Sequence, residues 1–377
     1  MDKIKTVSVR YNGRLVGTMA LYKNRQAAFE YSKEWLNDGF SISPFSLPLT
    51  QRVFIPKVEP FEGLYGVFAD SLPDGWGRLL VDRLLLKKHI NPFEISSMDR
   101  LAIVGPSGMG ALTYEPVHHF ELSNQAVDLD KIAAECANML RTDYSDNLDD
   151  LFRLGGSSGG ARPKILTTID DIEWIIKFPS SDDAKNIGEQ EYQYSLCARE
   201  CRIPMEETKL FSSDTGPGYF GTRRFDRRID TNGKEKRIHM LSVSGILETS
   251  HRIPNLDYNI LMKLTLELTK DFSEVEKMYR LMCFNVFAHN RDDHSKNFTF
   301  LYNDEKDGWF LSPAYDLTYS VSIGGEHATC VNGNGRNPDL RDILEVAKNI
   351  GMTERKAKVI AEGIKDIVAA YKLSNYK

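Results

Sequence analysis

Hydrophobic and polar positions alternate with a period of two near the N-terminus and with a helical period further along the chain. The run TVSVRYNGRLVGTMAL (residues 6–21) alternates on both sides of Asn12-Gly13, a dipeptide typical of two-residue turns, and predicts a β-hairpin. After the helix-breaking Pro-Asp-Gly of residues 73–75 the apolar positions recur at helical spacing. This spacing predicts a helix whose apolar face contains Leu79, Leu80, Leu84 and Leu85.

The middle of the chain contains a Gly-rich segment. In FRLGGSSGGARPKILTTIDDIEWIIKFPS (residues 152–180) we expect a Gly-rich loop between strand-like runs, with EWIIKFP as an apolar strand that carries one lysine. A helix is expected next in IGEQEYQYSLCARECRI (187–203), followed by a strand and a connector in GYFGTRRFDRR (218–228). Beyond Asp226 the pattern becomes mainly helical.

Composition limits the classes of function. The chain has 377 residues, enough for two or three domains. Its net charge of -5 and pI near 6.0 argue against a protein that binds nucleic acid by itself. The five cysteines lack a paired metal spacing, so we expect buried thiols and no zinc site. No apolar run of signal-peptide or membrane-spanning length is found, and we expect a reducing cytoplasmic compartment.

The most informative stretch is NRDDHSKN (residues 290–297), which is followed by PAYD (313–316). Asp292 stands five residues before Asn297, and Asp316 follows about twenty residues later, as phosphoryl-transfer enzymes space a catalytic base and two magnesium ligands. Asp292 is therefore the expected base, and Asn297 and Asp316 the expected Mg²⁺ ligands, since Mg²⁺ prefers oxygen donors. Lys296 would neutralise charge on the transferred phosphoryl group, and His294 would orient the loop through a ring nitrogen bound to a backbone carbonyl. The alternative is a polar turn whose charges only face water.

Residues upstream fit the binding of a nucleotide. Glycines let backbone amides approach phosphates, so the loop containing Ser157, Ser158 and Gly159 is expected to bind a nucleotide triphosphate. Lys177, on the apolar strand, is the expected partner of the phosphates, and Glu191 or the nearby Glu189 would pair with the lysine. The alternatives are a Gly-rich hairpin without a ligand, an edge-strand lysine that reaches water, and solvated acids at a helix start.

Seven strings of the chain resemble one protein family. They are FADSLPDGWGRLLVDR, VGPSGMGAL, GGSSGGARPK, IIKFP, RRFDRR, DDHSKNF and SPAYDL, and they are similar to those of the HipA-like serine/threonine kinases, the toxin halves of bacterial toxin-antitoxin modules. The resemblance covers nearly the whole chain. It implies an ATP- and Mg²⁺-dependent protein kinase with an α+β fold of two lobes, similar to protein and phosphatidylinositol kinases, with an added β-rich N-terminal subdomain.

The resemblance also implies domains. Residues 1–120 would form the HipA-type β-rich subdomain, 121–226 the rest of the N-lobe with the Gly-rich loop and the phosphate-binding lysine, and 227–377 the mainly helical C-lobe with the catalytic and metal-binding motifs. The polar stretch from about residue 121 to 130 marks the first boundary.

Individual roles follow from the same resemblance. It supports the base, metal-ligand and lysine assignments above, and it places Arg223 and Phe225 where the family's connector meets adenine. Ser157 matches the loop serine whose autophosphorylation ejects the loop and silences the family's kinases, with Ser158 as the adjacent candidate. Asp293 stands where the family often has a smaller or neutral residue, so two neighbouring carboxylates compete for the role of base, and the spacing to the asparagine favours Asp292.

The resemblance implies partners as well. A small helix-turn-helix antitoxin like HipB is expected, with operator DNA contacted only through it, and a protein substrate such as an aminoacyl-tRNA synthetase. No membrane partner is expected. Two other classes of function stay open: a small-molecule or lipid kinase on the same fold, and a pseudokinase that binds nucleotide as a regulatory module.

Overall fold

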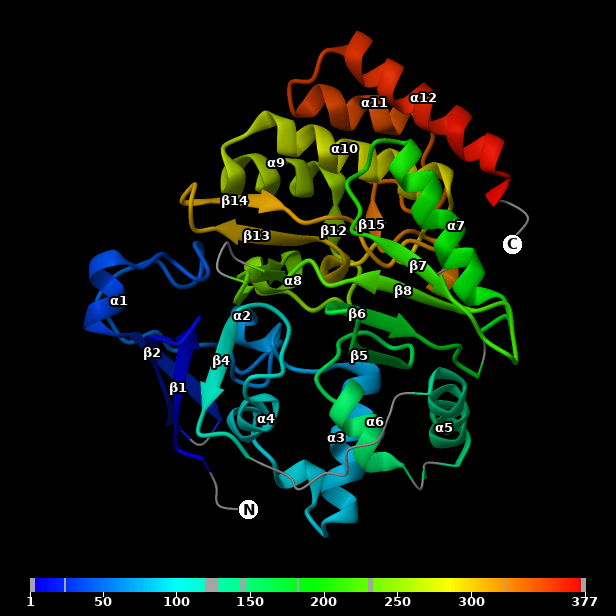
Figure 1. Cartoon of the computed structure of the whole chain (residues 1–377). Helices are drawn as coiled ribbons and strands as arrows, with labels where there is room; N and C mark the ends of the chain where they lie inside the picture. Colours follow the sequence, from blue (N-terminus) through cyan, green and yellow to red (C-terminus); the bar gives the residue numbers. More distant parts are fainter. Residues whose placement is uncertain are drawn as a thin grey trace. The chain divides into compact units, whose positions relative to one another are not determined.

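The computed structural model describes residues 4–23, 25–118, 128–142, 145, 147–181, 183–229, 233–321 and 323–373 (Figure 1). Two compact units divide the chain. Unit 1 contains residues 1–188, 209–241 and 245–249, and unit 2 contains residues 189–208, 242–244 and 250–377. The fold is a mixture of helices and strands, whereas the division into three domains at residues 120 and 226 stays a prediction.

Unit 1 begins with an antiparallel sheet. Its strands are β1 (Thr6–Tyr11), β2 (Arg14–Tyr22), β3 (Gln26–Tyr31) and β4 (Leu112–Glu115), in the order β3-β2-β1-β4. The predicted hairpin between β1 and β2 is confirmed, with φ of 45° at Asn12 and 86° at Gly13, the positive values that a tight two-residue turn requires.

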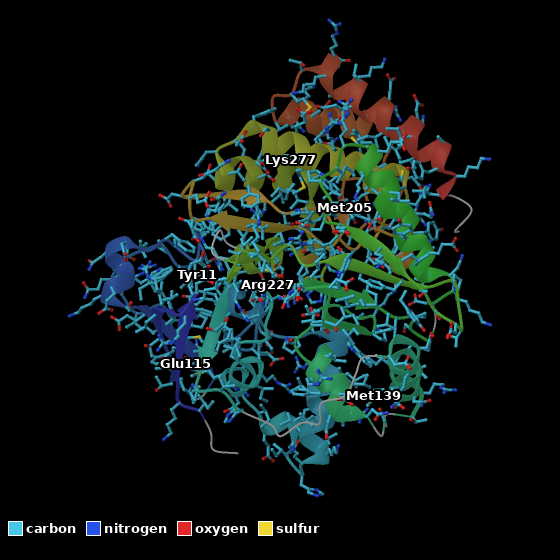
Figure 2. The ribbon with its side chains drawn as sticks, viewed as in Figure 1. Tyr11, Glu115, Met139, Met205, Arg227 and Lys277 are labelled. Carbon is cyan, nitrogen blue, oxygen red and sulfur yellow. The ribbon has the colours of Figure 1, made fainter. Side chains whose placement is uncertain are left out.

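Around the Gly-rich segment, unit 1 has a second sheet and three packed helices. The sheet contains β5 (Lys164–Ile169), β6 (Ile172–Lys177), β8 (Tyr219–Arg223) and β7 (Thr208–Phe211), in that order. The helices α3 (Gly75–Lys87), α5 (Leu129–Thr142) and α6 (Leu148–Gly155) share one core with it, and α3 lies beside α6 (Figure 1). Met139 of α5, labelled in Figure 2, is fully buried in this core.

The predicted helix with the leucine-rich face is α3, and Leu80, Leu84 and Leu85 are buried in it. The expectation of strand-like runs on both sides of the Gly-rich loop is wrong on the N-terminal side, where the chain forms α6. Leu148, Leu151 and Leu154 recur every three residues and bury one face of that short helix, which a strand with a period of two could not do.

Unit 2 is built mainly of helices. It contains most of α7 (Ile187–Glu200), together with α9 (Tyr258–Thr269), α10 (Phe272–Phe287), α11 (Leu340–Asn349) and α12 (Glu354–Tyr371). In Figure 1, α10 lies between α9 and α12. The antiparallel pair β13 (Thr299–Asn303) and β14 (Gly308–Leu311) and the short parallel pair β12 (Leu256–Asp257) and β15 (Thr329–Cys330) complete it.

The remaining elements are short. They are α1 (Lys33–Asp38), α2 (Gly66–Ala69), η1 (Pro92–Glu94), α4 (Ser97–Val104), β9 (Arg227–Ile229), β10 (Glu235–Arg237), β11 (Met240–Ser242), α8 (Val243–Ile246), η2 (Ser295–Asn297) and η3 (Ile323–Gly325). The C-terminal half therefore matches the expectation of mainly helical structure, with strand pairs inserted at β9–β10 and β13–β14. No helix among the described residues is long and apolar enough to cross a membrane.

Candidate functional site

In unit 2, the loop of residues 290–297 follows α10 directly. The hydroxyl of Tyr194 on α7 donates a hydrogen bond of 2.8 Å to the carbonyl of Ala288, which fixes the end of α10. His294 then caps the single turn η2, because its Nδ1 accepts a hydrogen bond of 3.2 Å from the amide of Lys296. His294 thus contacts the loop backbone through the amide of Lys296, and the expected bond from a ring nitrogen to a carbonyl stays a prediction.

The two adjacent carboxylates of this loop differ sharply in environment. The side chain of Asp292 is 61% exposed, and its Oδ1 lies 3.9 Å from Nε2 of His294. The side chain of Asp293 is completely buried, and its Oδ2 accepts hydrogen bonds from the Tyr258 hydroxyl at 2.9 Å and from Nδ1 of His327 at 3.0 Å. Its Oδ1 accepts a third from the amide of Thr329 at 3.2 Å. Only Asp292 therefore presents its carboxylate toward solvent.

Backbone features distinguish the two expected metal ligands, Asn297 and Asp316. Nδ2 of Asn297 donates a hydrogen bond of 2.6 Å to the carbonyl of Asp292, which turns the amide so that its oxygen is the atom left to act as a ligand. Asp316 has φ of 55°, a left-handed conformation that is costly for a residue with a side chain and that concentrates at functional sites. Tyr315 joins the two segments, since its hydroxyl donates to the carbonyl of Lys296 at 2.5 Å and lies 2.6 Å from Oγ1 of Thr299. An amide oxygen and a carboxylate are donors that suit Mg²⁺.

In unit 1, the start of α3 holds the Gly-rich loop. The carboxylate of Asp74 accepts a hydrogen bond from the amide of Gly160, and the amide of Trp76 donates 3.0 Å to the Gly160 carbonyl. The indole Nε1 of Trp76 donates 3.1 Å to the carbonyl of Lys164. Within the loop, the Ser158 hydroxyl donates 2.6 Å to the carbonyl of Gly155. The motif around residues 73–77 is thus the support of the Gly-rich loop, a link that sequence reasoning missed.

Two lysines face each other next to this loop. Lys177 at the end of β6 is 8% exposed, and its Nζ lies 5.6 Å from the ring centroid of Phe220. Lys164 at the start of β5 is directly opposite Lys177 in the antiparallel register and is equally buried, at 7% exposed. Lys164 was missed, although it begins an apolar strand just as Lys177 ends one.

The acid expected to pair with Lys177 lies in unit 2. Glu191 on α7 is buried, at 3% exposed, so the alternative of a solvated acid at a helix start does not apply to it. Glu189 is half-buried in the first turn of the same helix.

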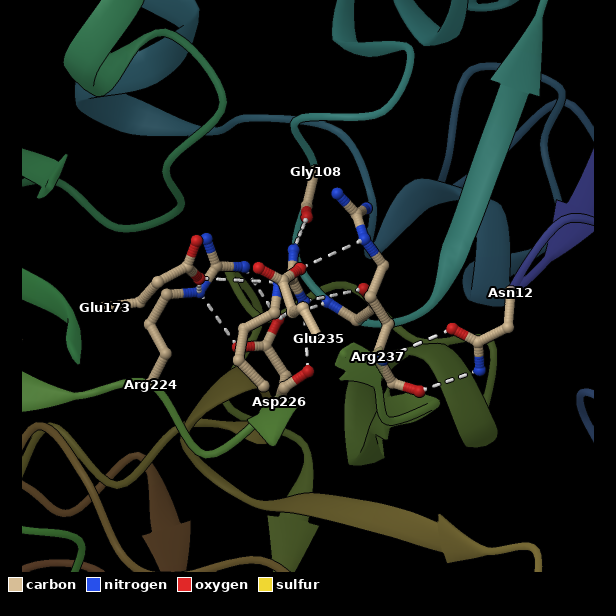
Figure 3. Close-up of polar contacts among 9 residues, drawn as sticks. Asn12, Gly108, Glu173, Arg224, Asp226, Glu235 and Arg237 are labelled. Atoms are coloured by element: carbon tan, nitrogen blue, oxygen red, sulfur yellow. Dashed lines mark hydrogen bonds and ion pairs between the residues drawn. The ribbon is translucent and has the colours of Figure 1, made fainter. Parts of the chain in front are cut away.

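The connector residues Arg223 and Phe225 lie at the end of β8 and just after it, and both side chains are half-buried. Between and after them Arg224, Asp226 and Arg227 form a buried ion network (Figure 3). Asp226 Oδ2 accepts from Nη2 of Arg224 at 2.8 Å and from Nη1 of Arg227 at 2.7 Å. Burial by itself would raise the pKa of Asp226, but the two guanidinium groups have the larger combined effect and lower the pKa to about 2. The network ties the connector in place.

The same network reaches two other segments of unit 1. Arg227 donates hydrogen bonds to the carbonyls of Gly108 and Gly110, at 3.1 and 3.0 Å, and the Gly110 amide donates 2.6 Å to Asp226 Oδ2. Asn12, in the turn of the first hairpin, donates 3.0 Å to the carbonyl of Arg237 on β10 (Figure 3). The Gly-rich turn VGPSGMGAL is therefore a structural partner of the connector.

Two family models match this chain. The model of the HipA N-terminal domain matches residues 7–115, and that of the HipA-like C-terminal domain matches residues 156–371, more than half of the chain. The chain belongs to the HipA family. The resemblance found in the sequence strings is thereby confirmed.

Individual relatives of this HipA-family chain are distant. Two Sinorhizobium fredii proteins, named Putative kinase Y4mE and Putative kinase Y4dM, are 26% and 24% identical to it, over 96% and 88% of this chain and 84% and 81% of their own lengths. Among solved structures, a chain of the Shewanella oneidensis MR-1 toxin-antitoxin complex of HipA, HipB and operator DNA matches with a TM-score of 0.72 and 15% identity, over 98% of this chain and 90% of its own. This structural likeness shows a shared fold.

Proposed function

We propose that this HipA-family chain is an ATP- and Mg²⁺-dependent serine/threonine protein kinase with the two-lobed kinase-like fold. The names of the Sinorhizobium relatives support a kinase, and the unequal environments of Asp292 and Asp293 are the observation that carries the assignment of its base. Asp293 already accepts hydrogen bonds on both oxygens, so a substrate hydroxyl would transfer its proton to Asp292.

The other site residues take the roles expected from the sequence. Asn297 and Asp316 would hold Mg²⁺, which when bound neutralises charge on the nucleotide phosphates, and Lys296 would face the transferred phosphoryl group. His294 supports this loop by capping η2. The unusual backbone at Asp316 and the Asn297 bond to the Asp292 carbonyl support these assignments.

The nucleotide would be bound by residues of unit 1. The amides of the Gly-rich loop at Ser157, Ser158 and Gly159, together with Lys177, would contact its phosphates, and Glu191 would keep the lysine oriented. We add Lys164 to this set, because it is buried and lies directly opposite Lys177 in the register of β5 and β6. Arg223 and Phe225 would meet the adenine.

Autophosphorylation is proposed at Ser157. The hydroxyl of Ser158 is engaged by the Gly155 carbonyl and the residue is 1% exposed, whereas Ser157 is 8% exposed. A dianionic phosphate on either serine would repel the nucleotide phosphates, so the loop would have to leave the support of Asp74 and Trp76. Single Ser157→Ala and Ser158→Ala variants form a matched pair. The modification is expected to disappear from the first alone, as read by mass spectrometry of the loop peptide, and its loss only from the second would reverse the assignment.

The experiment that tests the kinase is the intact mass of the purified protein after incubation with Mg-ATP. The parent chain is expected to gain phosphoryl groups, and an Asp292→Asn variant is expected to gain none, because Asn cannot accept the proton. An unmodified parent that also fails to hydrolyse ATP would favour the pseudokinase alternative. Transfer to a lipid or metabolite in place of protein would favour the small-molecule kinase.

The biological role proposed is that of a growth-arrest toxin. The Shewanella relative is in a complex with HipB and operator DNA, which supports a HipB-like antitoxin as partner here, with DNA contacted indirectly, and an aminoacyl-tRNA synthetase is the proposed type of substrate. Expression without an antitoxin is expected to stop growth, and Asp292→Ala is expected to abolish this effect. Equal toxicity of both forms would reject the proposal.

A further inference from the structure

A second feature of the loop at residues 290–297 goes beyond its base and metal ligands. Asp293 lies at the centre of a buried polar network in unit 2 that begins and ends in this loop. Asn290 donates from Nδ2 to Oδ1 of Asn285 at 2.9 Å, and Nδ2 of Asn285 donates to the Tyr258 hydroxyl at 2.9 Å. That hydroxyl donates to Asp293. These four side chains are at most 2% exposed, so the ring of hydrogen bonds is closed off from water.

The network also includes residues 327–329, in the segment that follows Asp316. Thr329 contacts Asp293 twice, through its amide to Oδ1 at 3.2 Å and through its Oγ1 to the Asp293 carbonyl at 2.5 Å. His327, 4% exposed, contributes the bond from Nδ1, and the amide of Ala328 donates 3.1 Å to the carbonyl of Arg291. Residues 327–329 are therefore attached to residues 291–293 by side-chain and main-chain bonds together.

Burial of a carboxylate is costly unless its oxygens are hydrogen-bonded, and here both oxygens are. Burial raises the pKa of Tyr258 well above its ordinary value, and the nearby Asp293 adds to the effect, so the hydroxyl stays a donor. An Asn at position 293 would keep the shape but turn one acceptor into a donor, facing groups that already donate. The arrangement thus specifies a side chain with two acceptor oxygens at this position.

We propose that Asp293 is a positioning residue that couples the segment after Asp316 to the loop that carries Asp292. Asp293 is the chain neighbour of Asp292, and its hydrogen bonds attach residues 291–293 to residues 327–329. The position of the base is therefore fixed relative to the segment that follows the metal ligand Asp316. The inference rests on the proposed kinase function. It assigns to Asp293 a role in the rate of transfer and none in the binding of ATP.

The test compares Asp293→Asn and one matched pair of tyrosine variants with the parent by steady-state ATP hydrolysis, with Mg-ATP as the only probe. Asp293→Asn is expected to lower kcat roughly a hundredfold, as small displacements of a catalytic group do, with KM for ATP within about twofold of the parent. Tyr258→Phe removes one donor to the carboxylate and is expected to lower kcat about tenfold.

Tyr279→Phe is the control for Tyr258→Phe. Tyr279 is equally buried in unit 2, but its hydroxyl donates to the Ala357 carbonyl at 3.2 Å, away from the loop. This variant is expected to lose stability and keep the parent's kcat per folded molecule. A loss of kcat in Tyr279→Phe equal to that in Tyr258→Phe, or parent-like kcat in Asp293→Asn, would overturn the proposal.

Hydrogen exchange separates failure of this inference from failure of the proposed function. If the parent hydrolyses no ATP, the kinase proposal fails, but the coupling is still measurable. The amides of Ala328 and Thr329 are expected to exchange at least about tenfold faster in Asp293→Asn than in the parent, because local opening costs less when a bond is lost. Exchange in α12 is expected to be unchanged. Unchanged exchange at residues 328 and 329 would overturn the coupling whatever the activity.

Discussion

The buried ion network of unit 1 allows a sharp prediction for Asp226→Asn. Asp226 is fully buried, and its two oxygens accept three bonds from Arg224 and Arg227 and one from the Gly110 amide, at 2.6–3.0 Å. An Asn offers a single acceptor oxygen and aims an NH₂ group at the arginines. Removing the charge of one member of a buried ion pair costs about 3–5 kcal/mol of stability, because the charge of the other member stays buried without compensation. We expect the free energy of unfolding to fall by that amount.

The assay is urea unfolding followed by tryptophan fluorescence at pH 7. Trp76 and Trp174 are buried in the core of unit 1, so in a Trp309→Phe background the signal comes from unit 1 alone. Asp38→Asn, which breaks the exposed pair with Arg14 at 2.6 Å in the same unit, is the matched control and should cost at most about 1 kcal/mol. A loss below about 1 kcal/mol in Asp226→Asn would refute the reasoning.

Acid supplies an independent check on the same residue. The folded pKa of Asp226 is about 2, below its ordinary value of 3.8, so its charge stabilises the fold above pH 3.8 and this contribution is lost as the pH falls toward 2. The shift corresponds to about 2.5 kcal/mol. The difference in stability between parent and Asp226→Asn should therefore shrink by about 1 kcal/mol between pH 7 and pH 3. A difference that widens in acid would contradict the assignment.

Three further predictions concern other parts of the molecule. Tyr315→Phe removes the hydroxyl bound to the Lys296 carbonyl and should cost about 1 kcal/mol in urea unfolding and lower kcat for ATP hydrolysis; a parent-like kcat would argue against this link in the site. Asp130→Asn should lower the urea midpoint at pH 7, because hydrogen bonds hold the Asp130 pKa at about 2, and this deficit should vanish as the pH falls from 4 toward 2. Gly63→Ala should cost at least about 2 kcal/mol by thermal unfolding, since φ is 84° and a Cβ would lie 1.8 Å from the Arg25 carbonyl oxygen; a smaller loss would mean that the backbone adapts.

Sequence patterns predicted the elements whose residues interact locally. The β1–β2 hairpin follows from the Asn12-Gly13 turn, and α3 follows from its leucine spacing. The strand-like run expected at residues 152–154 was wrong, because three residues before the Gly-rich loop are too few to distinguish a period of two from the helical period of α6. Local pattern is thus reliable for long or turn-marked elements.

Long-range partners could not be read from the sequence. The spacing of the motif favoured Asp292 over Asp293 as base. The structural reason is that the carboxylate of Asp293 already accepts hydrogen bonds from Tyr258, His327 and Thr329, which are 34 to 36 residues away from it. Tyr258 precedes Asp293 by 35 residues, whereas His327 and Thr329 follow it. Such pairing depends on tertiary packing, which neither charge nor periodicity encodes.

The two lysines that are paired across β5 and β6 have a consequence for the stability of unit 1. Lys164 and Lys177 are paired in register and each is less than a tenth exposed, so two positive charges are brought to one place in unit 1. A compact polyanion that contacts both Lys164 and Lys177 would bind the folded state and not the unfolded chain, and such binding appears as added stability. Unit 1 should therefore depend on its ionic surroundings, with phosphate or sulfate protecting it from unfolding before any nucleotide is present.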